Sequence, residues 1–181
     1  MSTSEKIIFT IGHSTKPFNE FIGLLNGFNI RLLADVRSFP GSRRFPQYNK
    51  ESLMQTLPQS GIEYQHFPVL GGRRKAQRDS KNTVWKNEAF RGYADYMETT
   101  DFENGIFRLE KIALQKLTAY MCSEALWWRC HRSLISDYLK LKGWTVLHIM
   151  AINKAVEHPY TAAANIADGK LNYHAEGKRL F

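Results

Sequence analysis

Cysteine is scarce in this chain, since only Cys122 and Cys130 occur among 181 residues. Two thiols in one segment cannot form the disulfide framework of a small secreted domain, and a reducing compartment suits them whether they react or simply pack. No stretch approaches the roughly 18 consecutive apolar residues of a membrane-spanning helix, and the first residues lack the apolar region and cleavage site of a signal peptide. We therefore expect a soluble cytoplasmic protein with no membrane partner.

The composition also excludes a disordered chain. Hydrophobic residues make up 43% and aromatic residues 13%, which is enough apolar surface to build a core. A mass of 20.9 kDa is close to the common size of one compact unit. With no internal linker or sequence repeat visible, we predict a single domain over residues 1–181.

Acidic residues are outnumbered, with 17 Asp and Glu against 25 Lys and Arg, for a net charge of +8. The excess is uneven, because residues 37–91 hold 11 basic and 4 acidic side chains. Such a block attracts phosphate, nucleic acid or another anion, but it is equally typical of a solvated surface.

Short apolar runs alternate along the chain with segments of helical periodicity. The runs predict five strands, at residues 7–11, 32–36, 62–67, 117–122 and 144–149. The segments between them predict helices at residues 17–28, after Asn49 as far as Gly61, within 88–116, and from Cys130 to Lys142. Strands that alternate with helices need crossover connections, so the predicted fold is a single-domain, doubly wound α/β fold with a mostly parallel sheet of about five strands flanked by helices.

Two segments have no regular pattern. Residues 68–87 predict a long polar loop of a kind that is often functional or mobile. The tail after Met150 carries turn signals at His158-Pro159 and Asp168-Gly169, and residues 158–160 and 180–181 are expected to return to the core.

In an open parallel sheet the ligand lies beyond the carboxyl ends of the strands, where loops and helix N-termini converge. The segments that follow the first four predicted strands are polar, glycine-rich and cationic. They predict one site at a single edge of the sheet, built from His13, Ser14, Arg37, Arg43, Arg44, Gly71, Gly72, Arg73, Glu124, Cys130, His131 and Arg132.

Each of the first three segments also has a purely structural interpretation. Gly12 to Thr15 would serve as a turn and a helix cap, and Asp35 would pair with Arg37 or with another loop arginine. The pairs Arg43-Arg44 and Arg73-Arg74 would be surface charges. Alternatively, the two pairs clamp a phosphate or carboxylate, and Gly71-Gly72 lets backbone amides approach it.

The fourth segment is the most specific. A strand that ends in Cys122 is followed by a loop and then by Cys130-His131-Arg132 at a predicted helix N-terminus. The helix dipole and the cations there favour a thiolate or a bound anion, and we expect Cys130 to be the more acidic thiol. Glu124 would then be a general base, an orienting partner of His131 or an ion-pair partner of an arginine.

A metal site is a weaker interpretation of the same residues. Cys122, Cys130 and His131 could join His13 or His66 around an ion, but the chain has no closely spaced C-x-x-C pair. The sequence therefore predicts no metal and no cofactor. Alternatively, the thiols are buried and unreactive.

Taken together, these segments resemble the family called domain of unknown function 488, which has no agreed activity. The resemblance rests on motifs spread along most of the chain: residues 10–15, 35–40 with 42–44, 70–73, Cys122-x-Glu124, 130–132, 158–161 and 168–171. It implies a compact α/β domain with one polar site. A looser likeness to rhodaneses and related phosphatases lies in the Asp-Val-Arg strand end and in a cysteine that follows a strand.

The sequence thus predicts an enzyme that acts on a phosphate-bearing substrate, a nucleotide or a nucleic acid. Its anion would bind Arg43, Arg73 and Arg132, His13 or His131 would transfer protons, and Cys122 or Cys130 would be the nucleophile. The alternative is a noncatalytic nucleic-acid-binding module that uses the same basic face.

Overall fold

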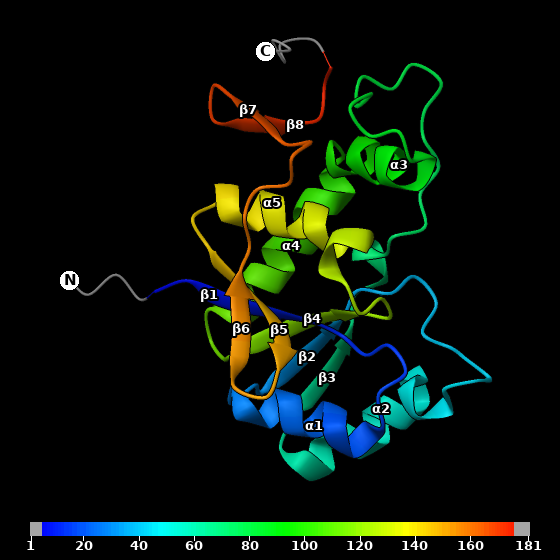
Figure 1. Ribbon diagram of the computed structural model, residues 1–181, viewed down its shortest axis with the longest axis vertical. Helices are drawn as coiled ribbons and strands as arrows, with labels where there is room; N and C mark the ends of the chain where they lie inside the picture. Colours follow the sequence, from blue (N-terminus) through cyan, green and yellow to red (C-terminus); the bar gives the residue numbers. More distant parts are fainter. Residues whose placement is uncertain (1–4, 176–181) are drawn as a thin grey trace.

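A central sheet with helices on both of its faces makes up the body of the molecule in the computed structural model, which describes residues 5–175 (Figure 1). The sheet has six strands in the order β3-β2-β4-β1-β5-β6, and all neighbours are parallel except β5 and β6. Their bounds are β1 Ile7–Gly12, β2 Leu32–Asp35, β3 Glu63–His66, β4 Thr118–Cys122, β5 Thr145–Ala151 and β6 Lys154–Glu157. The predicted α/β fold with a mostly parallel sheet is confirmed.

Each face of the sheet is covered by its own group of helices (Figure 1). On one face, α1 (Phe18–Gly27) and α2 (Lys50–Thr56) pack over Phe9, Leu33 and Met121. On the other face, α3 (Glu88–Met97), α4 (Thr100–Ala113) and α5 (Arg132–Leu141) pack over Ile8, Ala34 and Tyr120. Successive strand residues point to opposite faces, which is why both cores are apolar. Among the described residues, no helix has the length and apolar character needed to cross a membrane.

The tail adds structure that the sequence pattern did not reveal. Ile152 and Asn153 form a two-residue turn into β6, with Asn153 at φ 56°, and four residues are too few to show strand alternation. A separate hairpin of β7 (Asn165–Ala167) and β8 (Lys170–Asn172) turns at the predicted Asp168-Gly169. His158 is buried, whereas residues 180–181 lie outside the described part of the chain.

Two predicted helix starts are corrected. The last helix begins at Arg132 and not at Cys130, because the short 3₁₀ helix Trp127–Arg129 leads Cys130 into an extended conformation. Asn49 does precede α2, but its side-chain oxygen accepts the Ser42 amide at 2.6 Å and so fastens the preceding loop instead of capping the helix.

The chain leaves the adjacent strands β1 and β4 toward opposite faces of the sheet. After β1 it enters α1 on one face, and after β4 it reaches α5 on the other. Gly12 and Cys122 are register partners at the ends of these two strands. This divergence is the topological switch point at which open α/β sheets bind ligands.

Candidate functional site

A pocket of about 430 Å³ opens at this switch point, at the carboxyl ends of β1, β2 and β4. The structure places seven of the predicted site residues around it: His13, Arg37, Gly72, Arg73, Glu124, Cys130 and His131. Its volume falls within the range of small-molecule sites. Loops that are far apart in the sequence therefore share one concave surface.

The loops after β1 and β4 are joined along their backbones. The His13 amide donates to the Cys122 carbonyl at 3.1 Å, and the Ser14 amide donates to the Ser123 carbonyl at 2.9 Å. A Cβ on Gly12 would overlap the Glu124 carbonyl oxygen, so only glycine permits this approach. Gly12 thus holds the loop with Glu124 against the end of β1.

Arg37 enters the pocket wall as part of a buried ion pair. Its Nε and Nη2 donate to the two Asp35 carboxylate oxygens at 2.8 and 2.6 Å, and Nη2 also donates to the Tyr48 carbonyl. The Tyr64 hydroxyl is a further donor to Asp35, at 2.7 Å. The predicted pairing of Asp35 with Arg37 is confirmed. With its charge offset by Asp35, Arg37 shapes the wall more than it attracts an anion.

His13 is held neutral next to Arg37. Its Nδ1–H donates to the Ser14 carbonyl at 2.9 Å, which leaves Nε2 to accept from Arg37 Nη1 at 3.3 Å. The ring also stacks on Tyr48, with centroids 4.1 Å apart. Burial, followed by the charge of Arg37, lowers the pKa of His13 to about 4, against its hydrogen bond to Ser14. The Ser14 carbonyl thus orients the ring, and the other ring nitrogen contacts Arg37.

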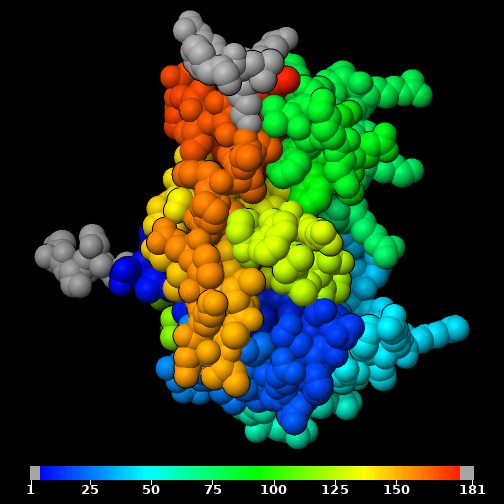
Figure 2. All heavy atoms as spheres, in the orientation of Figure 1, coloured from blue at the N-terminus to red at the C-terminus, as the bar shows by residue number. Residues whose placement is uncertain are grey.

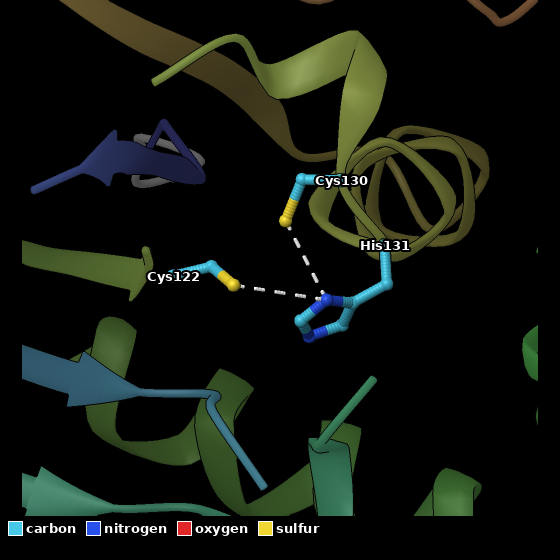
Figure 3. A group of neighbouring side chains, drawn as sticks. All are labelled: Cys122, Cys130 and His131. Atoms are coloured by element: carbon cyan, nitrogen blue, oxygen red, sulfur yellow. Dashed lines mark hydrogen bonds between the residues drawn. The ribbon is translucent and has the colours of Figure 1, made fainter. Parts of the chain in front are cut away.

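Cys122, Cys130 and His131 lie together in the pocket wall, where β4 ends and α5 begins (Figure 3). His131 Nε2 lies 2.9 Å from the Val36 carbonyl oxygen, which can only accept, so Nε2 carries the proton. The unprotonated Nδ1 then faces both thiols, at 3.5 Å from Cys130 Sγ and 3.9 Å from Cys122 Sγ. Val36 thus fixes His131 as an acceptor for a thiol proton.

The two thiols differ in acidity, in the direction expected from the sequence. Burial raises the pKa of Cys130, but its hydrogen bond with Cys122, the charge of Arg132 and hydrogen bonds with Arg132 outweigh burial and lower the pKa to about 6. The hydrogen bond with Cys130 and burial raise the pKa of Cys122 to about 12, against the influence of His131. The pair therefore carries its negative charge on Cys130.

Glu124 lines the pocket but does not orient His131, because Val36 and the thiols occupy both nitrogens of that ring. Its carboxylate is exposed, and its backbone carbonyl accepts from Arg132 Nη2 at 2.5 Å. Of the three predicted roles, that of orienting His131 is therefore not supported by the structure.

Five of the predicted site residues, namely Ser14, Arg43, Arg44, Gly71 and Arg132, are not part of the pocket lining. Arg43 and Arg44 are exposed on the loop after β2, which projects from the body in light blue and cyan (Figure 2). Ser14 contributes a backbone turn at φ 49°. A Cβ on Gly71 would overlap the Ser38 side chain, and one on Gly72 would overlap the His131 ring. The two glycines therefore make room for side chains, where the sequence had suggested amides that approach an anion.

Arg132 lies behind the pocket wall in a buried polar chain. Its Nη1 donates to Thr10 Oγ1 at 3.0 Å, and that hydroxyl donates to His148 Nδ1 at 3.0 Å. His148 Nε2–H then donates to His158 Nδ1, and His158 Nε2–H donates to Asp137, both at 2.9 Å. These hydrogen bonds are compatible with a single assignment of donors and acceptors. The network therefore holds the Arg132 guanidinium in a fixed position next to Cys130.

Other lining residues were not predicted as part of the site. Arg129 is exposed at the pocket, as Arg73 is, and Phe39, Phe45 and Phe90 supply aromatic walls. The basic loop before Cys130 was the only signal for Arg129. Nothing in the local sequence sets Phe90 apart from a core residue. In the same loop, Trp127 stacks on His148 with centroids 4.3 Å apart, which is the packing role that its apolar character favours.

A family model described as "Domain of unknown function DUF488" matches residues 17–139. The matched region runs from α1 into α5 and includes the motifs at residues 35–40, 70–73, 122–124 and 130–132. The motifs at residues 10–15 and in the tail lie outside it. No curated protein and no solved structure matches the chain.

Proposed function

The chain belongs to the family of domain of unknown function DUF488, and from that premise we propose that it is an enzyme acting on a small phosphate-bearing substrate such as a nucleotide. Cys130 is the nucleophile and His131 accepts its proton. The observation that carries the proposal is the hydrogen bond from His131 Nε2–H to the Val36 carbonyl, because it aims the free Nδ1 at Cys130. A thiol beside an oriented acceptor is the arrangement of an activated nucleophile.

The cations of the pocket support a negatively charged substrate. Arg73 and Arg129 are both exposed and both line the pocket, and the Arg73 amide donates to Ser38 Oγ at 3.2 Å, which anchors its loop. Arginine side chains bind phosphate oxygens in a bidentate manner. The phosphate would act as a handle that holds an electrophilic atom of the substrate near Cys130, with Glu124 placed to activate water.

The aromatic walls support a substrate with a flat ring. Phe39 is 73% exposed although it is large and apolar, and the Arg73 guanidinium lies 5.4 Å from its ring centroid. Exposed aromatic side chains beside cations are typical of surfaces that stack nucleobases. Phe39 and Arg73 together would hold the base and the phosphate of one nucleotide.

A second candidate function, noncatalytic nucleic-acid binding, is favoured by the exposed cations outside the pocket. Arg43 and Arg44 are exposed on the projecting loop after β2, and Lys75 and Arg78 are exposed on the loop after β3. Binding through such a surface would weaken steeply with salt and would not need Cys130 or His131.

Arg73 and Arg43 form a matched pair that separates the two functions. We expect Arg73→Ala to weaken the binding of inorganic phosphate and adenosine monophosphate about tenfold, because it removes a charged donor from the pocket. Arg43→Ala, which removes an arginine that is also exposed but lies outside the pocket, should leave both affinities unchanged. Isothermal titration at fixed ionic strength measures both. Equal losses in the two variants would favour the surface over the pocket.

The proposed nucleophile is tested by alkylation. In protein treated with a chelator and a reductant, we expect iodoacetamide to label Cys130 at least about tenfold faster than Cys122, because Cys130 carries the negative charge of the pair. Peptide mass mapping at timed intervals gives both rates, and His131→Ala should slow the labelling of Cys130. Should Cys130 label only after denaturation, it is a packed structural thiol and not a nucleophile.

A further inference from the structure

Cys122 is not a reacting group in the proposed chemistry, although its thiol lines the pocket, hydrogen-bonds Cys130 and faces the same nitrogen of His131. A mechanism with one nucleophile and one proton acceptor needs only Cys130 and His131. Cys122 is buried at the end of β4, where its exposed fraction is 8%. A second thiol held at this point requires an explanation of its own.

The three ligand atoms lie at the corners of a triangle that suits a tetrahedral metal ion. Cys122 Sγ, Cys130 Sγ and His131 Nδ1 all lie within 4.8 Å of one another. The two sulfur-to-nitrogen distances are 3.9 and 3.5 Å. For zinc bonds of ~2.3 Å to sulfur and ~2.0 Å to nitrogen, a tetrahedron requires about 3.5 Å between sulfur and nitrogen. Both sulfur-to-nitrogen distances are therefore within a few tenths of an ångström of the separation that a zinc ion requires.

The hydrogen bond of His131 is a second, independent indication of a metal. Metal-binding histidines usually donate their other ring N–H to a carboxylate or a backbone carbonyl, which fixes the tautomer and aims the free nitrogen at the ion. His131 Nε2–H does this toward Val36, and Figure 3 shows the imidazole and both thiols directed toward a common point.

From this geometry we propose that Cys122, Cys130 and His131 bind one thiophilic divalent cation, zinc in particular. Two thiolates and an imidazole are ligands that zinc prefers over hard oxygen-seeking ions. Two thiolates also neutralise the charge of the ion, which allows binding although the Arg132 charge lies close to Cys130. Because all three residues line the pocket, a water or a substrate atom supplies the fourth ligand from that side.

Zinc at this site would block the nucleophile, a consequence that rests on the proposed function. Binding replaces the thiol protons by metal–sulfur bonds and releases them to solvent, with no change in oxidation state. The Cys130 sulfur then shares one lone pair with the ion, which draws its negative charge toward the metal and lowers its reactivity toward an electrophile. By supplying the third ligand, Cys122 therefore allows zinc to inhibit the pair of Cys130 and His131.

Cobalt and zinc titrations of the full chain, stripped of metal and kept reduced, test the site. We expect Co²⁺ to bind one to one with a thiolate-to-cobalt charge-transfer band and the intense visible bands of a tetrahedral ion, and Zn²⁺ to displace it. Cys122→Ser and Cys130→Ser should each weaken binding at least about tenfold. Ser42→Ala, which removes a hydroxyl of the same pocket whose partner is the Phe45 amide and not a proposed ligand, should bind as the parent does. Circular dichroism verifies that each variant folds.

The absence of the charge-transfer band, or equal binding by both cysteine variants and the parent, would overturn the metal site. The alkylation of Cys130 separates this outcome from a failure of the proposed function. If zinc binds but metal-free Cys130 is unreactive, the site stands and the nucleophile fails. If metal-free Cys130 reacts but zinc neither binds nor slows its labelling, the nucleophile stands and the metal site fails.

Discussion

Replacing Asp137 with alanine should lower the free energy of unfolding by about 3–5 kcal/mol, the range for a buried charge network that loses one partner. The Asp137 carboxylate is completely buried. It accepts four hydrogen bonds, from His158 Nε2 at 2.9 Å, the Thr161 amide at 2.8 Å, the Thr161 hydroxyl at 2.6 Å and the Tyr173 hydroxyl at 2.9 Å. Alanine leaves these donors buried without an acceptor, which costs more than the hydrogen bonds themselves contribute.

Urea unfolding followed by circular dichroism measures the loss, and thermal unfolding should show a midpoint lower by roughly 10 °C. Glu157→Ala is the control, because Glu157 is 62% exposed and its ion pair with Lys140, at 3.0 Å, lies on the surface. This control should change stability little. If Asp137→Ala were equally mild, the tail would not be fastened to α5 through this carboxylate.

Acid should destabilise the protein because two buried histidines are neutral in the folded state. Burial, followed by the charges of His158 and Arg132, lowers the pKa of His148 to about 2, and burial lowers that of His13 to about 4. In the unfolded chain both titrate near ~6.5, so below that pH the unfolded state binds more protons than the folded state. The stability contributed by the neutral histidines is complete above ~6.5 and falls as the pH drops toward the folded pKa values.

Between pH 7.5 and 4.5, we expect His148 alone to account for a loss of about 2–3 kcal/mol. Urea unfolding at several pH values gives the slope, which His148→Gln should flatten because it removes one titrating group. An unchanged slope in His148→Gln would mean that His148 is not the group that acid protonates.

Much of the fold could be predicted because its strands are short apolar runs. Segments such as Ile7–Ile11 and Leu32–Val36 are buried on both faces, so their composition identifies them without any tertiary contact. The strand order could not be predicted, since β4 lies between β1 and β2 by pairing with segments that are far from it in the sequence. β6 was not predicted from the sequence. This strand has only four residues and is identified by its antiparallel pairing with β5, not by a pattern of its own.

The position of the candidate pocket could also be predicted. The rule that ligands bind at the carboxyl ends of parallel strands led to His13, Arg37, Arg73, Glu124 and His131, which the structure brings around one pocket. The same rule could not distinguish arginines that are exposed at the pocket from arginines that are buried and hydrogen-bonded within the protein. Arg132 and Arg129 are three residues apart in the sequence, but one is 1% exposed and hydrogen-bonded behind the wall while the other is exposed at the pocket.

The alternation of strands and helices, the edge of the sheet that carries the polar loops, and the presence of two thiols beside an imidazole can all be predicted from the amino-acid sequence. These properties follow from local composition and from the direction of parallel strands. The protonation and orientation of the imidazole, in contrast, depend on a tertiary contact. The Val36 carbonyl, which holds the proton on Nε2 of His131, is 95 residues away in the chain, and β2 brings it there by pairing with β4. A tautomer set by so distant a backbone atom leaves no pattern in the sequence around Cys130.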